Sequence, residues 1–403
     1  MSEAMTSDSL NPAEVDLPES WVKRLPVVGF ALAIIGGVLT AVLAHGHGHD
    51  FYFSYLVAYL YFLSIALGGL FFVLVQHATR AGWSTVVRRL AEDLMGTLPL
   101  FALLFIPIFL GAHDLYHWTH ADVVAADPIL QGKTGYLNEG FFTVRAVIYL
   151  ATWTALAIYF RRRSIAQDSS GDVSITRRLQ TLSAPALVAY ALTQSFAAFD
   201  WLMSLDPHWY STIFPVYFFA GCVVAILAVL VVLTMGLQRS GALTEVVTTE
   251  HFHDIGKLLF GFVVFWAYIG FSQYMLIWYG NIPEETLWFA HRLEHGWRPW
   301  TVLLVVGHFV IPFLYLVSRH TKRRRSPLLI GALWLLVMHF VDLYWLVMPV
   351  AHPHATGLGL LDIAAWLAVG GLFLGTLGLL LRRRALVPVR DPRLAESLAF
   401  ENM

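Results

Sequence analysis

Cysteine is almost absent from this chain: Cys222 alone occurs among its 403 residues. A single cysteine excludes an internal disulfide, and it excludes an iron–sulfur cluster held by the cysteines of this chain. Charged residues are also scarce, at 13% against about 25% in an average soluble domain, while hydrophobic residues reach 58%. This balance indicates an integral membrane protein.

Long apolar runs dominate the pattern. A helix needs roughly 20 apolar residues to cross the hydrocarbon of a bilayer. About ten stretches meet this length, at 26–44, 51–76, 86–111, 138–160, 183–204, 210–236, 255–279, 299–318, 327–348 and 358–381. They are too long for barrel strands and do not alternate, so the sequence predicts an all-α integral membrane protein.

Basic residues are missing from one side of the predicted helices. If the chain starts in the cytoplasm and crosses ten times, four of the 26 Lys and Arg fall on the outer side, namely Lys133, Arg145, Arg292 and Arg298. The positive-inside rule then predicts that both termini are cytoplasmic. The polar start lacks the pattern of a cleavable signal peptide. We expect flexible tails at 1–25 and 384–403 around a membrane domain at 26–383.

An internal repeat relates two groups of four helices. The same three residue types recur at the same spacing, as Pro185, Asp200 and Pro207 and again as Pro327, Asp342 and Pro349. FSYLVAYLYF and YSTIFPVYFF match at serine and phenylalanine, and LAEDLMGTLPLFA and IGKLLFGFVVFWA follow in the same order, as do EGF at Glu139 and HGW at His295. These matches predict two related, parallel four-helix bundles, helices 2–5 (about 51–204) and 6–9 (about 210–348), with helices 1 and 10 peripheral.

The two aspartates are the main candidates for function. A carboxylate inside an apolar span is costly unless it is paired, protonated or hydrated, so Asp200 and Asp342 suggest a functional site. His339 lies on the same helical face as Asp342, and His308 lies at mid-depth on the preceding helix. Environment can bring the pKa values of such groups near neutrality. We therefore predict a proton relay formed by Asp200, Asp342, His339, His308, Glu92, Asp93, Lys257 and Tyr268.

Structural roles compete with this interpretation. A buried aspartate can cap a helix or pair with an arginine, and Glu92, Asp93 and Lys257 lie near enough to the interface to be helix-end or snorkelling charges. Outer histidines offer two candidate zinc sets, and His308 with His339 offers a candidate haem pair. We expect the chain itself to bind no metal. The candidate zinc sets are His45, His47 and His49, and His113, His117 and His120.

Two segments carry a family resemblance. FDWLMSLDPHWYSTIFPVYFFAG (199–221) and FVVFWAYIGFSQYMLIWYGNIPEETLWF (262–289) resemble the F subunit of bacterial alternative complex III, which is related to the NrfD/polysulfide-reductase membrane-subunit family. The resemblance extends over essentially all ten helices. It implies two four-helix bundles with peripheral first and last helices. The residues carried by the matching segments are Asp200, Asp206, His208, Tyr268, Gln273, Tyr274, Glu284 and Glu285.

The resemblance implies membership of a respiratory quinol:electron-acceptor oxidoreductase in the bacterial inner membrane. Its expected partners are membrane lipids, a related quinol-oxidising membrane subunit, an iron–sulfur subunit and cytochrome c subunits, with no nucleic acid. Haem c, iron–sulfur clusters and menaquinol or ubiquinol are expected in those partners and no cofactor in this chain. Its expected role is to scaffold the complex and conduct protons without a redox centre of its own.

Three other functions remain open at this point. Direct quinol binding requires a cleft accessible from the lipid with a hydrogen-bonding group, and Asp200 with His208 is the candidate pair. A purely structural anchor would need no exchangeable proton. A stand-alone secondary transporter agrees with the repeat, but the chain lacks paired helices interrupted by Gly or Pro.

Overall fold

The described part of the chain is all-α and contains ten helical spans. A computed structural model describes residues 11–402 except 47, 295, 355, 356 and 383, so residues 1–10 of the predicted tail, His47 and His295 lie outside the described residues. Every regular element in the described ranges is a helix, and ten helical spans are long and apolar enough to cross a membrane. The chain is therefore a multi-pass membrane protein, which confirms the sequence prediction at this level.

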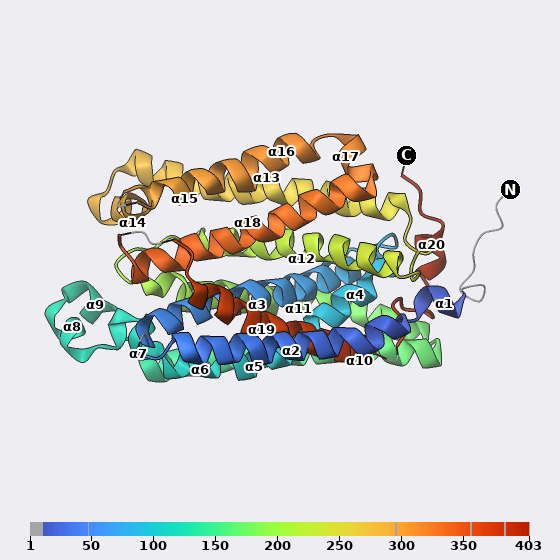
Figure 1. Cartoon of the computed structure of the whole chain (residues 1–403), viewed down its shortest axis with the longest axis horizontal. Coiled ribbons are helices and arrows are strands. Elements are labelled where there is room, and N and C mark those ends of the chain that lie inside the picture. The colour runs from blue at the N-terminus through green and yellow to red at the C-terminus, as the bar shows by residue number, and fades with distance from the viewer. Residues whose placement is uncertain (1–10, 47, 295, 355–356, 383, 403) are drawn as a thin grey trace.

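The spans lie side by side along the long axis of the molecule (Figure 1). They are α2 (Glu19–Leu43), α3 (Gly48–Ala78), α4 to α6 (Thr85–Met95, Leu98–Leu104, Ile106–Leu110), α10 (Glu139–Ser170), α11 with η3 (Val173–Trp201, Met203–Leu205), α12 (Phe214–Arg239), α13 (Thr249–Gly280), α15 with η4 and α16 (Arg298–Leu303, Leu304–Val310, Ile311–Leu316), α18 (Arg325–Ala351) and α19 (Leu360–Leu381).

Short helices cover the two ends of the bundle. One end carries α1 (Pro12–Val15), α17 (Arg319–Arg323) and α20 (Leu394–Leu398), and is called the basic end below because most Lys and Arg lie there. The opposite end, called the acidic end, carries α7 (Ala112–Leu115), η2 (His117–Thr119), α8 (Ala121–Ala126), α9 (Pro128–Lys133) and α14 (Pro283–Leu293).

Two spans extend well beyond the apolar runs from which they were predicted. The fourth continues to Ser170 and the fifth begins at Val173, because arginine and glutamine sustain a helix outside the hydrocarbon. Gly171 ends α10 in the left-handed conformation, with φ of 65°. The side chain of Asp172 then accepts the backbone N–H of Ser174 and caps α11.

Helix contacts form two closed circuits. In the first, α3 contacts α4 and α11, and α10 contacts both α5 and α11. In the second, α12 contacts α13 and α18, and α16 with η4 bridges α13 and α18. The circuits meet where α3 packs against α12 and α18, so α3 and α12, which are the most buried spans, occupy the centre of the molecule.

Helices α2 and α19 pack closely on each other through small residues. A side-chain carbon on Gly29 would lie 2.3 Å from the backbone nitrogen of Gly375, and one on Gly36 would lie 2.3 Å from that of Ala368. These glycines therefore allow the two backbones to touch, as in small-residue packing between membrane helices. The pair joins the bundle through contacts of α19 with α3.

The two tails, expected to be flexible, are packed together where they are described. Val15 and Leu386 are buried, and the Leu386 N–H donates to the Val15 carbonyl over 2.6 Å. The Leu243 N–H donates to the Glu14 carbonyl, and Leu394 of α20 is fully buried. These residues contain apolar side chains that bury against the basic end of the bundle, and the predicted tail boundaries stay a prediction.

Candidate functional site

Asp200 is held by a fixed cation. The Nε and Nη2 of Arg145 on α10 donate to its two carboxylate oxygens over 2.7 and 3.0 Å, and the Tyr149 hydroxyl donates over 2.8 Å. Arg145 also donates to the Tyr136 carbonyl over 2.8 Å and stacks on the Tyr136 ring. Asp200 is fully buried. The two-point geometry identifies a charge-assisted pair that braces α10 against α11.

Asp342 contacts neutral donors. The Tyr217 hydroxyl on α12 donates to one of its oxygens over 2.5 Å, and the Trp266 indole on α13 donates to the other over 3.1 Å. In the described part of the chain neither oxygen contacts a cationic side chain. Asp342 is 2% exposed. It is therefore a buried carboxyl group without the fixed counter-charge that Asp200 has.

His308 lies on the face of Trp266, the indole whose N–H group donates to this carboxyl group. Its imidazole stacks on the indole with ring centroids 4.0 Å apart and planes at 16°. His308 is fully buried, and neither ring nitrogen has a hydrogen-bond partner among the described residues. It lies in η4, where seven residues are wound as a π-helix. Such wide turns are frequent at functional sites.

His339 borders the same space as Asp342. Its Nε2 lies 2.7 Å from the Ser64 hydroxyl, and that hydroxyl donates to the Tyr61 carbonyl. Ser64 is then an acceptor for His339, so we assign the proton of the neutral ring to Nε2. The other nitrogen, Nδ1, has no partner in the described residues. A side-chain carbon at Gly221 would lie 3.3 Å from it and 3.9 Å from the Asp342 carboxylate.

Asp342, His339 and His308, three of the predicted relay residues, therefore belong to one buried polar group. We call it the α18 cluster, and it also includes Tyr217, Trp266 and Ser64. Three imidazole nitrogens in it lack partners among the described residues. Buried nitrogens without a hydrogen-bond partner typically cost about 1–3 kcal/mol each.

Arg292 is a buried cation near this cluster. The sequence predicted only that it lies on the outer side of the membrane. It lies on α14, donates to the carbonyls of Trp288 and Leu346 over 3.0 and 2.9 Å, and stacks on the Trp288 ring. Burial lowers the pKa of its guanidinium, which stays charged at neutral pH. Leu346 lies one helical turn beyond Asp342, so Arg292 sits on the acidic-end side of the α18 cluster.

Glu92 and Asp93 lie at the basic end in a network of ion pairs. Glu92 is fully buried and contacts Arg88 and Arg89, and Asp93 pairs with Arg161 over 2.7 Å. The network continues to Asp168 on α10 and to Asp391 in the C-terminal segment. Arg161 also donates to the carbonyl of Leu380 over 2.9 Å. These contacts join α4, α10 and the end of α19, which is a bracing arrangement.

Lys257 and Tyr268 lie apart from the α18 cluster. Lys257 is half exposed at the basic end, where it pairs with Asp254 and donates to Asn402 over 2.8 Å. Tyr268 is 63% exposed on the outside of α13. The described contacts do not link either residue to the cluster. Their predicted relay role stays a prediction.

His208 and Asp200 are not brought to a shared site. The Nε2 of His208 lies 2.5 Å from Asp127, which caps α9 through the N–H groups of Ile129 and Leu130. Both oxygens of Asp200 are occupied by Arg145 and Tyr149. The geometry does not provide the paired quinol contact that these two residues were predicted to form.

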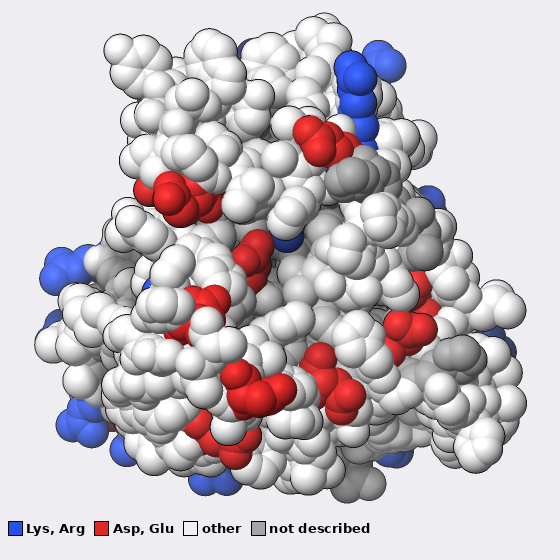
Figure 2. All heavy atoms as spheres, turned by 90° about the vertical axis from the view of Figure 1, so that its left-hand side faces the viewer, with Lys and Arg blue, Asp and Glu red and all other residues white. Residues whose placement is uncertain are grey.

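Acidic side chains gather on the face that carries α7 to α9 and α14. Figure 2 shows them spread over that end, with basic side chains mainly at its rim. No three His, Cys, Asp or Glu side chains come together as a metal site within the described ranges, and His47 lies outside them. The exposed acidic residues on this end are Asp114, Asp122, Glu139, Glu284 and Glu294, and Glu285 is partly exposed.

Comparison with known proteins does not assign this chain to a family. Neither models of protein families nor curated proteins give a significant match. The resemblance to the alternative complex III subunit consequently depends on residues 199–221 and 262–289.

Proposed function

We propose that this chain is a proton-handling and scaffolding membrane subunit of a bacterial respiratory quinol:electron-acceptor oxidoreductase of the alternative complex III type. The family resemblance supports the choice of complex. The α18 cluster supports the proton role. Partner subunits would hold the haem c, the iron–sulfur clusters and the quinol, and this chain would carry no redox centre.

The observation that carries the proton role is the contrast in the surroundings of Asp342. It is a buried carboxyl group whose direct partners, Tyr217 and Trp266, are neutral. A carboxylate locked to an arginine keeps its charge and cannot readily take up a proton. Asp342 has no arginine partner among the described residues. The Nδ1 of His339, which has no partner there either, borders the same space beside Gly221, so a proton can be accepted by either group.

The proposal assigns different tasks to the two aspartates. Asp342 with His339 and His308 would bind and release protons, whereas Asp200 with Arg145 would hold the fold. Moving one charge against 100 mV takes about 2.3 kcal/mol. Proton movement through the α18 cluster would therefore be coupled to quinol oxidation in a partner subunit.

The finer architecture forms part of the same proposal. The helices of the two circuits contact each other in the same order along the chain, which supports two related four-helix bundles with α2 and α19 outside them. The concentration of arginine at the end with α1 and α20 supports a cytoplasmic location for that end and for both termini.

Copurification tests the choice of complex. The tagged chain is isolated in mild detergent from membranes of its own host, and the eluate is assayed for haem c, iron–sulfur clusters and quinol oxidation. We expect all three to be retained. A chain that elutes alone, from membranes whose quinol-oxidising complex remains intact without it, would contradict membership.

Substitution in the α18 cluster tests the proton role. Asp342→Asn and His339→Gln are introduced into the copurified complex, which is reconstituted in vesicles with quinol and an artificial acceptor. We expect proton release per electron to fall while electron transfer persists at low membrane potential. Tyr279→Phe, at the exposed surface of α13, is the control and should leave both rates unchanged. Unaltered proton release in both cluster variants would refute this role.

A further inference from the structure

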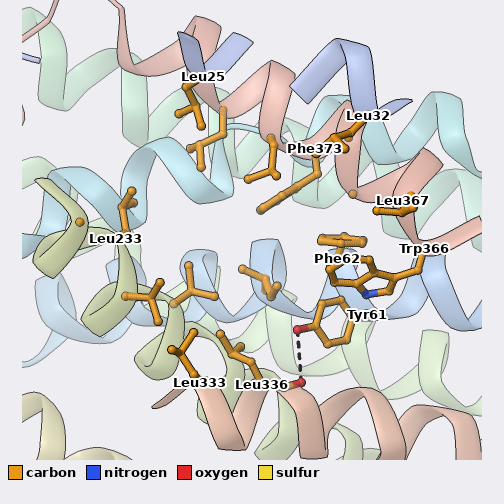
Figure 3. A pocket seen from close by; sticks show the side chains of 18 of the residues that line it. Leu25, Leu32, Tyr61, Phe62, Leu233, Leu333, Leu336, Trp366, Leu367 and Phe373 are labelled. Carbon is orange, nitrogen blue, oxygen red and sulfur yellow. Dashed lines mark hydrogen bonds between the residues drawn. The ribbon is translucent and has the colours of Figure 1, made fainter. Parts of the chain in front are cut away.

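An apolar crevice separates the α2–α19 pair from α12 and α18. Its volume is about 460 Å³, within the range of roughly 300–1,000 Å³ typical of ligand pockets. Figure 3 shows side chains from both walls directed into one space, with α3 as its floor. It is open toward the lipid, because Leu333 on its edge is 46% exposed. Its labelled lining residues include Leu25, Leu32, Phe62, Leu233, Leu336 and Phe373.

The crevice has the length of one bilayer leaflet. Its lining on α2 runs from Trp21 to Leu32, and on α19 from Trp366 to Leu377. At 1.5 Å per residue each wall is about 16 Å long. The hydrocarbon of a whole bilayer is about 30 Å thick. The crevice thus reaches from the basic end to about the middle of the membrane, which matches the depth of one acyl chain.

The mouth of the crevice is cationic. Arg239 lines it at the last turn of α12, beyond Gly236. Arg325 lies one turn before the lining residue Leu329 on the same face of α18. Both arginines are exposed, and neither forms a hydrogen bond or ion pair with another described residue. Two free guanidinium groups at this level suit a phosphate, since arginine binds phosphate oxygens through paired N–H groups.

The deep end of the crevice exposes little polar surface, although the indole nitrogen of Trp366 has no hydrogen-bond partner among the described residues. The Tyr61 hydroxyl donates to the Leu336 carbonyl over 3.2 Å, as the dashed line in Figure 3 shows. The indole nitrogen of Trp366 is buried and points toward the Tyr61 ring. A chain that ends in hydrocarbon therefore fits this end better than one that ends in a polar ring.

We propose that the crevice binds an anionic phospholipid of the leaflet at the basic end. One acyl chain would lie between Leu333 and Phe62, and the phosphate would lie between Arg239 and Arg325. Basic pockets between membrane helices are known to select anionic head groups. This inference requires that the chain spans a membrane, and it does not depend on the proton role.

Lipid binding by the purified chain in detergent tests the head-group contact. Phosphatidylglycerol or phosphatidylcholine is titrated in, and bound lipid is counted by native mass spectrometry. We expect preferential binding of phosphatidylglycerol, and binding about thirty-fold weaker in Arg239→Gln/Arg325→Gln, because each basic residue contributes about 1 kcal/mol. The matched control is Arg177→Gln/Arg178→Gln, exposed on α11 and outside the crevice, which should bind as the wild type does.

A second pair of variants tests the acyl-chain contact. Leu333→Trp fills the open edge of the crevice and should abolish the tightly bound lipid, whereas Leu192→Trp at an exposed position of α11 should not. Unchanged phosphatidylglycerol binding in Leu333→Trp would overturn the placement of the chain. Equal loss in the two arginine pairs would show only general attraction to a basic surface and would overturn the site.

Discussion

Asp200 and Asp342 occupy matching places in the sequence repeat but lie in opposite electrostatic environments. Arg145 grips Asp200 through two hydrogen bonds, while Asp342 receives only the Tyr217 hydroxyl and the Trp266 indole. The two environments differ because α10 supplies an arginine to Asp200, whereas the described neighbours of Asp342 supply only neutral donors. Four predictions follow from this contrast and from the charges around it.

The first prediction concerns stability. Asp200→Asn leaves the Arg145 guanidinium buried without a counter-charge, so we expect the free energy of unfolding to fall by about 3–5 kcal/mol. Asp342→Asn removes no counter-charge and replaces one accepted hydrogen bond, so we expect a loss of about 1–2 kcal/mol. Unfolding by sodium dodecyl sulfate in mixed micelles, followed by circular dichroism, measures both. Equal losses would contradict the assigned difference in environment.

The second prediction separates stability from proton handling at His308. His308→Phe keeps the ring stacked on Trp266 and removes two nitrogens that lack described partners. We expect the free energy of unfolding to stay unchanged or to rise by about 1–2 kcal/mol, because an unsatisfied buried polar group is lost. Proton release by the reconstituted complex should nevertheless fall. A destabilised variant with normal proton release would instead identify His308 as structural.

The third prediction compares two charges at the basic end. Glu92→Gln leaves Arg88 and Arg89 with less buried negative charge, so we expect a loss of about 3–5 kcal/mol in the free energy of unfolding. Lys257→Met at a half-exposed position should change it by less than about 0.5 kcal/mol. The same micelle titration measures both. An equal loss in the free energy of unfolding for the two substitutions would show that the buried ion-pair network stabilises the fold no more than the half-exposed Lys257 does.

The fourth prediction is a local acid transition at the acidic end. The hydrogen bond from His208 lowers the pKa of Asp127 below its ordinary value of 3.8, aided by the N–H groups of Leu130 and Ile129. The folded segment therefore gains stability above pH 3.8, and it loses that stability as the pH falls through the lowered pKa. We expect amide hydrogen exchange at Ile129 and Leu130 to accelerate below about pH 4, after correction for the intrinsic exchange rate.

Asp127→Asn provides the control for this transition. It removes the titrating group, so its exchange at these two amides should no longer show the acid step. At neutral pH it should exchange faster than the wild type, because the contact with His208 loses its charge. Persistence of the step in this variant would assign the transition to another group.

Much of the fold was predictable because the length and hydropathy of each apolar run can be read directly from the sequence. All ten apolar runs correspond to spans, including the one interrupted within α4 to α6. The packed tails were missed because Val15 and the five-residue run ALVPV (385–389) are too short to predict a buried element, and only their pairing across the chain explains the burial of Val15 and Leu386. The π-helix was missed because LVVGHFV has no feature that distinguishes it from an α-helical stretch.

The candidate site was predictable in part for the same reason. The short spacing of His339 and Asp342 places them on one helical face, and the structure brings His308 to them. Tyr217 and Trp266 were not found, because aromatic residues are common in every span. Arg145 left a usable signal as one of four basic residues on the outer side, but its partner lies 55 residues away.

The π-helical turn at η4 accommodates about one residue more than an α-helical turn would hold. Deleting one residue between Leu304 and Val310 would therefore let this stretch relax to ordinary winding while α16 keeps nearly the same orientation. The side chains inside the turn would point in new directions, and His308 would leave the indole on which it rests.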